Sequence, residues 1–186
     1  GVVQSLAEIA GEPYRSFPLA MMRYGEGGIG GWGSICGVVN GAGAVIGLFY
    51  GNRPKEEREA LIGEFCAWYE ATPLPRFQPE KPEWAPEVPP SAAHSILCHV
   101  SLPQWCEVSK KSAFSMEKRE RCRRLTVDGA LKIVEILNRA LEGGETAAAP
   151  APAVQACTAC HGSKGRGDAM GKMSCAPCHK LPDPHP

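Results

Sequence analysis

Two short cysteine–histidine motifs near the C-terminal end are the residues most able to carry chemistry in this chain. Each has the pattern C-x-x-C-H, and the two motifs occupy 157–161 and 175–179. Two thiols at this spacing can each form a thioether with one vinyl group of a haem, and the histidine that follows can bind the haem iron as its proximal ligand. The sequence therefore predicts two covalently attached c-type haems, with these attachment and proximal residues: Cys157, Cys160, Cys175, Cys178, His161 and His179.

A zinc site is the alternative for the same cysteines. Without the histidines, the four cysteines have the spacing C-x2-C-x14-C-x2-C, which is close to that of a four-cysteine zinc site. Such a site needs no histidine after each cysteine pair, whereas this chain has one after both pairs. The repeated histidine therefore favours haem over zinc.

The second axial ligand of each haem must come from elsewhere in the chain or from a partner. The chain has five histidines, and besides the two proximal ones these are His94, His99 and His185. His94 and His99 lie in the body of the chain, so ligation by them would tie the haem segment to that body. His185 lies in the proline-rich tail and is the weaker candidate. Met170 and Met173 could bind instead, and would give a higher reduction potential.

Five cysteines remain outside the haem motifs, and an odd number cannot all pair as disulfides within one chain. Four metal ligands and one buried free thiol would account for them. Cys36, Cys98, Cys106 and Cys122 are the candidate ligands of an iron–sulfur centre or a structural zinc ion. Cys66 lies among core residues of a predicted helix, where a free thiol is common. The spacing matches no common ferredoxin pattern, and two disulfides are a further alternative, but the neighbouring haem motifs favour a redox centre.

The elements that must position these residues are mostly helices. Apolar periodicity and end signals predict helices over 2–10, 34–48, 55–70 and from Ser115 to about 142, with Ser34 and Ser115 as N-caps. The helix over 34–48 is apolar on all sides, so we expect it to be the central buried helix. Its start would place a cysteine near a helix N-terminus, where free N–H groups favour a thiolate.

The helices are joined by two unusual loops. A glycine-rich segment over 25–33 permits positive φ angles and close backbone approach, and a strap over 72–90 contains seven prolines. We therefore expect a mostly α protein with three parts: a small helical cysteine-rich domain over 1–145, an Ala/Pro linker over 146–156 and an irregular dihaem segment over 157–186. About 30 residues cannot bury two haems alone, so the body or a partner chain must shelter them.

Composition excludes several classes of function. The formal net charge is zero, so nothing global indicates binding to nucleic acid or to an anionic membrane. No apolar run reaches the roughly 18 residues of a membrane-spanning helix. Because haem c is attached outside the cytoplasm, we expect a periplasmic or otherwise extracytoplasmic protein whose leader has been removed.

A basic cluster is expected to be a solvated helix face, or else a site for haem propionates or an acidic redox partner. Its members are Lys110, Lys111, Lys118, Arg119, Arg121, Arg123 and Arg124.

Several stretches resemble the split-Soret cytochromes c of sulfate-reducing bacteria, and the body resembles the wider cysteine-rich redox-associated family. They are MMRYGEGG (21–28), WGSICGVVNGA (32–42), LCHVS (97–101), WC (105–106) and RC (121–122), together with the two C-x-x-C-H motifs. The resemblance implies a helical domain with an iron–sulfur cluster, for which we favour 2Fe-2S. It also implies two closely packed bis-histidine haems, and a homodimer in which a distal ligand can come from the other subunit.

Two features depart from the wider family. That family usually has a cysteine near its first helix, whereas this chain has none before Cys36. Cys66 has no assigned place in the pattern. Both departures leave the fourth cluster ligand open.

The function that these observations predict is electron transfer between the haems and the cluster, in exchange with redox protein partners, without bond-making chemistry. One alternative is a multihaem reductase of a small oxyanion such as nitrite, or of peroxide, which requires a haem with an open sixth position. Another is a structural electron-conduit subunit of a larger haem assembly.

Overall fold

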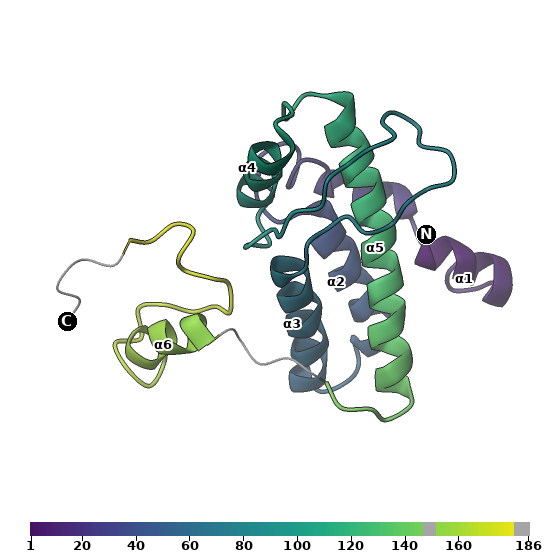
Figure 1. The fold of residues 1–186 in the computed structure, drawn as a ribbon. Coiled ribbons are helices and arrows are strands. Elements are labelled where there is room, and N and C mark those ends of the chain that lie inside the picture. Colours follow the sequence, from purple (N-terminus) through teal and green to yellow (C-terminus); the bar gives the residue numbers. More distant parts are fainter. Residues whose placement is uncertain (147–151, 181–186) are drawn as a thin grey trace. The chain divides into compact units, whose positions relative to one another are not determined.

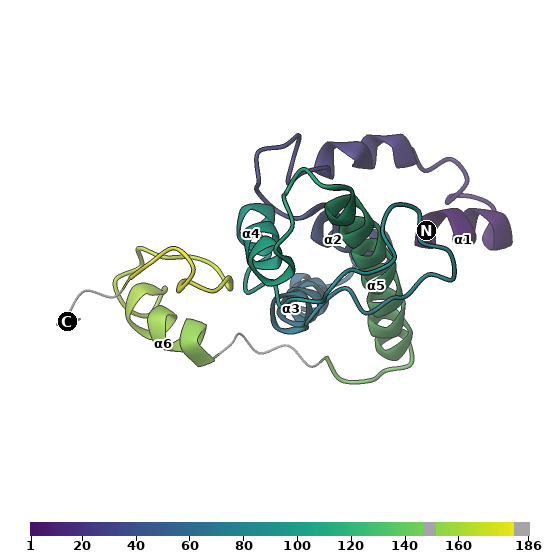
Figure 2. The same cartoon turned by 45° about the horizontal axis from the view of Figure 1, so that its top comes forward.

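The structure is a computed structural model that describes residues 1–146 and 152–180 (Figures 1 and 2). Its regular elements in these residues are helices, so the predicted mostly α fold class is confirmed. None of these helices is both long and apolar enough to cross a bilayer. The chain divides into two compact units, Gly1–Ala148 and Ala149–Pro186, and each is described by itself.

Three helices pack against one another to form the core of the first unit (Figure 1): α2 (Gly37–Tyr50), α3 (Lys55–Ala71) and α5 (Met116–Leu141). α2 is apolar on nearly all sides, as predicted for a central helix, and its Ile46 is fully buried. Gly129 allows α5 to approach α2 closely, because a side-chain carbon at this position would clash with a valine of α2. The core therefore depends on a close contact between α5, which carries Cys122, and α2, which Cys36 immediately precedes.

The predicted helix boundaries are confirmed most closely where the sequence carries a clear end signal. α1 (Val2–Ala10) has the predicted bounds, and α3 extends one residue beyond its predicted end. Ser115 is the N-cap of α5, as predicted, and its Oγ accepts a hydrogen bond from the backbone N–H of Lys118 at 3.2 Å.

The prediction of Ser34 as the N-cap of α2 is wrong. α2 begins at Gly37, and Cys36 occupies the cap position with an extended backbone. Ser34 Oγ instead donates to the carbonyl of Gly28 at 2.9 Å, which ties this serine to the glycine-rich loop. Cys36, a candidate metal ligand, therefore stands at the N-cap position of α2, although its side chain makes no capping hydrogen bond.

α4 (Cys98–Ser109) is a helix that the apolar pattern does not indicate. It contains Pro103, which lacks the N–H of a regular helical residue. Trp105 is fully buried in it, and its Nε1 donates to the carbonyl of Pro89 at 3.0 Å. The contact with the strap therefore stabilises a helix whose own sequence is only moderately favourable.

A 3-10 helix, η1 (Leu19–Gly25), leads into the glycine-rich segment, which forms a tight loop. Gly28 has a φ of 72°, and a side-chain carbon there would lie 2.6 Å from the backbone nitrogen of Ser34, so only glycine fits. The chain then enters an isolated antiparallel bridge between Ile35 and Leu97. This bridge brings the starts of α2 and α4 together.

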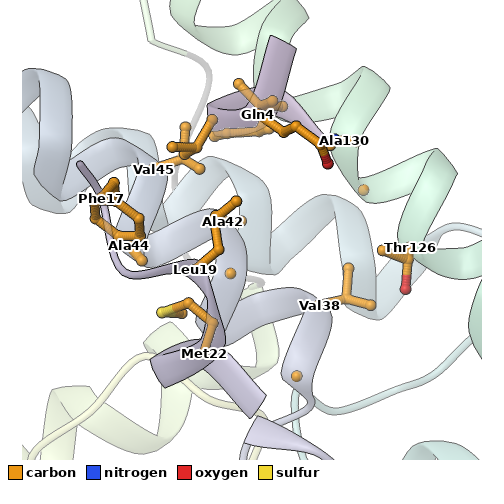
Figure 3. A pocket seen from close by; sticks show the side chains of 17 residues that line it. Gln4, Phe17, Leu19, Met22, Val38, Ala42, Ala44, Val45, Thr126 and Ala130 are labelled. Atoms are coloured by element: carbon orange, nitrogen blue, oxygen red, sulfur yellow. The ribbon is translucent and has the colours of Figure 1, made fainter. Parts of the chain in front are cut away.

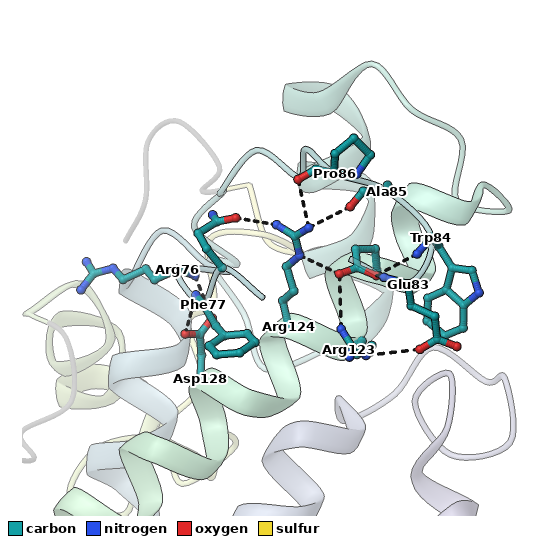
Figure 4. Close-up of polar contacts among 11 residues, drawn as sticks. Arg76, Phe77, Glu83, Trp84, Ala85, Pro86, Arg123, Arg124 and Asp128 are labelled. Carbon is teal, nitrogen blue, oxygen red and sulfur yellow. Dashed lines mark hydrogen bonds and ion pairs between the residues drawn. The ribbon is translucent and has the colours of Figure 1, made fainter. Parts of the chain in front are cut away.

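The proline-rich strap over 72–90 contains no helix, and buried charges bind it to α5 (Figure 4). The guanidinium of Arg124 donates to the Glu120 carboxylate at 2.8 Å, and to the carbonyls of Ala85 and Pro86 at 2.8 and 3.1 Å. The side chains of Arg124 and Glu120 are both fully buried. Because a proline-rich segment has few N–H groups of its own to pair with its carbonyls, these contacts satisfy groups that would otherwise be buried alone.

These contacts correct the expectation of a solvated basic face. Arg121 and Arg124 are buried, and they support the fold from inside. Arg123 remains half-exposed and pairs with Glu83 of the strap at 3.3 Å. The cluster is therefore not a continuous basic surface.

Candidate haem and metal sites

The first C-x-x-C-H motif lies at the end of α6 (Pro152–His161), in the second unit. Cys157, Cys160 and His161 stand at positions i, i+3 and i+4 of this helix, and such positions share one helix face. Cys157 and His161 are half-buried, whereas Cys160 is exposed. The helix therefore presents two thiols and one imidazole on the same side, which is the donor set that a c-type haem requires.

A carboxylate holds the imidazole of the first motif. The loop after α6 folds back, so that the backbone N–H groups of Asp168 and Ala169 donate to the carbonyl of His161 at 3.1 and 3.0 Å. Asp168 Oδ1 lies 2.9 Å from His161 Nδ1, and this hydrogen bond lowers the pKa of the Asp168 carboxyl. A carboxylate can only accept, so Nδ1 carries the proton and Nε2 has the lone pair that a metal ion requires.

Sequence reasoning missed Asp168. The available signal is an acidic residue in the short loop that follows the first motif. Its distance from His161 depends on how that loop turns, which the sequence does not indicate. The pairing supports the haem interpretation, since metal-bound histidines commonly donate their other N–H to a carboxylate.

The second motif forms a single helical turn. The backbone N–H groups of Cys178 and His179 both donate to the carbonyl of Cys175, at 3.1 and 2.9 Å. Burial raises the pKa of the Cys175 thiol, and a hydrogen bond with the thiol of Cys157 raises it further. The first cysteines of the two motifs therefore lie close together within the second unit.

The candidate distal ligands differ in how far the structure describes them. His94 and His99 are exposed on the first unit, and His94 has a positive φ of 55°. His185 lies outside the described residues. Met170 is fully exposed and Met173 is 39% exposed. The assignment of these residues to the haems stays a prediction.

Three candidate cluster cysteines lie close together in the first unit. Cys36 caps α2, Cys98 is the first residue of α4 and Cys122 lies in the second turn of α5. Burial raises the pKa of the Cys98 thiol, and the nearby thiols of Cys36 and Cys122 raise it further. Two backbone hydrogen bonds beside the Ile35–Leu97 bridge hold the first pair, Cys36 N–H to Ile96 O at 2.9 Å and Cys98 N–H to Ser34 O at 2.7 Å.

The remaining cysteines are placed differently. Cys106 lies two turns after Cys98, about 12 Å further along the axis of α4 at 1.5 Å per residue. Cys66 is half-buried in α3 against the apolar core. None of the nine cysteines, all of which lie in the described residues, forms a disulfide. The role of Cys106 as a fourth ligand stays a prediction, and the role of Cys66 stays open.

A buried polar network joins the cysteine group to three helices. The Tyr69 hydroxyl donates to Ser101 Oγ at 3.0 Å, and Arg121 Nη2 donates to the same Ser101 Oγ at 2.8 Å. Burial raises the pKa of Tyr69, and its contact with the Cys36 thiol raises it further, so the phenol stays neutral. Tyr69 and Ser101 were not indicated by sequence, because they lie on α3 and α4 and meet only in the folded chain.

The surroundings of Cys36, Cys98 and Cys122 suit a negatively charged metal centre. Arg121 is 4% exposed, and its Nε–H has no acceptor among the described residues. The positive charge of the buried guanidinium complements the negative charge that an iron–sulfur centre bound by the three thiolates would carry. No three cysteine, histidine or acidic side chains in the described part already stand at metal-binding distance, so the thiols would have to rotate toward one another on binding.

An apolar pocket of about 300 Å³ lies elsewhere in the first unit, between α1, η1, α2 and α5 (Figure 3). Gln4 and Thr126 are the polar side chains among its described lining residues, and none of these is a cysteine or histidine. The pocket is therefore separate from the candidate redox sites.

Comparisons with known proteins cover nearly the whole chain. Residues 1–136 match the family "Putative redox-active protein (C_GCAxxG_C_C)". The chain is 40% identical over 185 residues to the split-Soret cytochrome c of Desulfovibrio desulfuricans (strain ATCC 27774 / DSM 6949 / MB). That alignment covers 96% of this chain but 65% of the relative, so the chain spans slightly less than two thirds of the relative's length.

A solved structure is also similar. It is that of the split-Soret cytochrome c from Desulfovibrio desulfuricans ATCC 27774, reported with a novel iron centre. The TM-score is 0.89 at 38% sequence identity, and the match covers 96% of this chain and 76% of the other.

Proposed function

This chain belongs to the C_GCAxxG_C_C family of redox-active proteins, and from that premise we propose that it is an electron-transfer c-type cytochrome with two haems and an iron–sulfur centre. The observation that carries the proposal is the repeated set of two thiols and one imidazole in the second unit, with the imidazole of His161 held by Asp168. The similarity to a split-Soret cytochrome c supports the same conclusion.

Each motif would hold one haem through its own residues. Cys157 and Cys160 would form the thioethers of the first haem, and Asp168 would keep the imidazole of His161 oriented for the iron. A bound haem supplies a one-electron couple between ferric and ferrous iron. His94 and His99 are the proposed distal ligands, and two imidazoles on each iron would leave no open position for a substrate.

The iron–sulfur centre would be bound by the cysteine group of the first unit, with 2Fe-2S as the favoured type. Cys36, Cys98 and Cys122 are the ligands that the charges and burial support best, and Cys106 is the candidate for the fourth position. His99 directly follows Cys98, so one peptide would carry a haem ligand and a cluster ligand. Electrons would pass between these centres without any bond being made or broken.

We also propose a homodimer in the periplasm or another extracytoplasmic compartment, which exchanges electrons with redox protein partners. Cys160, Cys178 and His179 are exposed in the isolated chain. Two haems bound at these residues would need cover, and a second copy of the chain is the simplest source. Analytical ultracentrifugation of the haem-loaded protein should give twice the mass of one chain.

The test of the function uses the purified haem-loaded protein. Intact mass should show two haems on each chain, metal analysis should find iron beyond the haem content, and electron paramagnetic resonance should show both haems in the low-spin state. A high-spin haem whose spectrum changes on addition of nitrite would favour the reductase instead. A protein with one haem, or with zinc in place of non-haem iron, would contradict the corresponding part of the proposal.

A further inference from the structure

Arg121 is a buried positive charge that no acidic side chain balances in the described residues. It donates to Ser101 Oγ at 2.8 Å and to the Ser101 carbonyl at 3.4 Å, and its guanidinium lies 5.8 Å from the centre of the Trp105 ring. These partners are neutral. Its Nε–H is buried without an acceptor. A buried charge with only neutral partners is strongly unfavourable, so an anion is needed at this place.

Arg124, one turn further along α5, shows that the lack of an anion is specific to Arg121. The two arginines are similarly buried. Arg124 has the fully buried carboxylate of Glu120 at 2.8 Å, together with neutral acceptors from the strap. The fold thus supplies a counter-charge for one buried arginine and leaves the other without one.

The groups around Arg121 that can become anionic are the cysteine thiols. Cys122 is its neighbour in the chain, and the positive charge of Arg121 acts to lower the pKa of the Cys98 thiol, against burial and the other thiols. Cys36 is linked to Arg121 through Tyr69 and Ser101. The guanidinium is therefore fixed beside the cysteines that are the candidate cluster ligands.

We propose that Arg121 is the charge-balancing and positioning residue of the iron–sulfur centre, and that its Nε–H donates to a sulfur atom of that centre. This inference rests on the proposed function. The reduced centre carries one more negative charge than the oxidised one, so a nearby fixed positive charge stabilises the reduced form and raises the reduction potential. Ser101 and Trp105 hold the guanidinium in place.

The test replaces Arg121 by methionine in the haem-loaded protein, which keeps an apolar stem against Trp105 and removes the charge. The control is Arg119→Gln, which removes one positive charge from an exposed position on the same helix. A redox titration followed by electron paramagnetic resonance measures the potential of the non-haem centre. We expect Arg121→Met to shift its reduction equilibrium at least tenfold toward the oxidised form, which is 59 mV for a one-electron couple, and Arg119→Gln to shift it less than threefold.

A purely structural role predicts a different result. In that case Arg121→Met would keep its non-haem iron and a reduction equilibrium within threefold of the wild type, and the proposal would be wrong. If Arg121→Met loses the iron, Arg121→Lys decides, because lysine keeps a positive charge at the same place. Full iron content in Arg121→Lys supports charge balance, whereas loss of iron in this variant as well overturns it.

Failure of the inference can be told apart from failure of the proposed function. If the wild-type protein contains no non-haem iron, the iron–sulfur part of the proposed function is contradicted, and the role of Arg121 with it. If the wild-type protein holds the centre and the Arg121→Met protein has an unchanged reduction potential, only the role of Arg121 is contradicted. The haem potentials should stay unchanged in every variant.

Discussion

Replacing Arg124 by methionine tests whether buried charges hold the proline-rich strap on α5. Methionine keeps part of the apolar stem but removes the hydrogen bonds to Glu120, Gln78, Ala85 and Pro86. The variant therefore leaves the buried carboxylate of Glu120 without its nearest cation, and strap carbonyls without their donor.

The magnitude follows from the burial of the pair. Glu120 is fully buried, and without Arg124 it would keep the backbone N–H groups of Glu83 and Trp84, at 3.3 and 3.2 Å, and a 3.5 Å contact with Arg123. Removal of one partner from a buried pair costs about 3–5 kcal/mol, and we expect a loss of about 4 kcal/mol in the free energy of unfolding. Small domains have about 5–15 kcal/mol in total, so the variant should be close to its stability limit.

The assay is urea unfolding of the haem-loaded protein, followed by far-ultraviolet circular dichroism. The matched control is Lys55→Met, which breaks the exposed pair between Lys55 and Glu59, where the side chains are 70% and 46% exposed. That change should cost less than about 1 kcal/mol. A loss in Arg124→Met as small as that in the control would refute the reasoning, because it would mean that the strap does not depend on the buried charges.

Three further predictions concern the haem motifs and the glycine-rich loop. Asp168→Asn removes the charged acceptor from the proximal imidazole of the first motif, so the potential of one haem should rise while the other stays unchanged in a spectroscopic redox titration. Cys157→Ala combined with Cys160→Ala should leave one haem on the chain by intact mass, and two remaining haems would contradict the assignment of this motif. Gly28→Ala should cost at least about 2 kcal/mol in thermal unfolding because it combines a positive φ with a backbone clash, whereas Gly30→Ala, which meets no atom, should cost about 1 kcal/mol.

The parts of the fold that could be predicted are those with local causes. Helix periodicity and the cap at Ser115 depend on residues within a few positions of one another, and both are confirmed. The two C-x-x-C-H motifs are also local, because their spacing lies within five residues, and their attachment of haem stays a prediction. α4 could not be predicted, since Pro103 and its mixed polarity argue against a helix that the buried Trp105 stabilises from outside.

The parts that could not be predicted depend on distant residues. Arg121 and Arg124 have the sequence features of a solvated basic face, and nothing local shows that a strap about 40 positions away covers one of them. Tyr69 and Cys36 lie on different helices and meet only through the packing of α2 on α3. Sequence thus identified the candidate ligands, but not the neutral phenol and the unbalanced guanidinium that surround them.

At the start of α4, two adjoining residues are the proposed ligands of two different centres. Successive residues of a helix point about 100° apart, so Cys98 is half-buried near the other thiols while the imidazole of His99 is exposed. The backbone of His99 is nevertheless fixed, because its N–H donates to the carbonyl of Gly33 at 2.8 Å. Gly33 also lies so close that a side-chain carbon there would stand 3.0 Å from His99 Cβ. One rigid peptide therefore directs a thiol inward and an imidazole outward, as the proposal of a cluster ligand at Cys98 and a haem ligand at His99 requires.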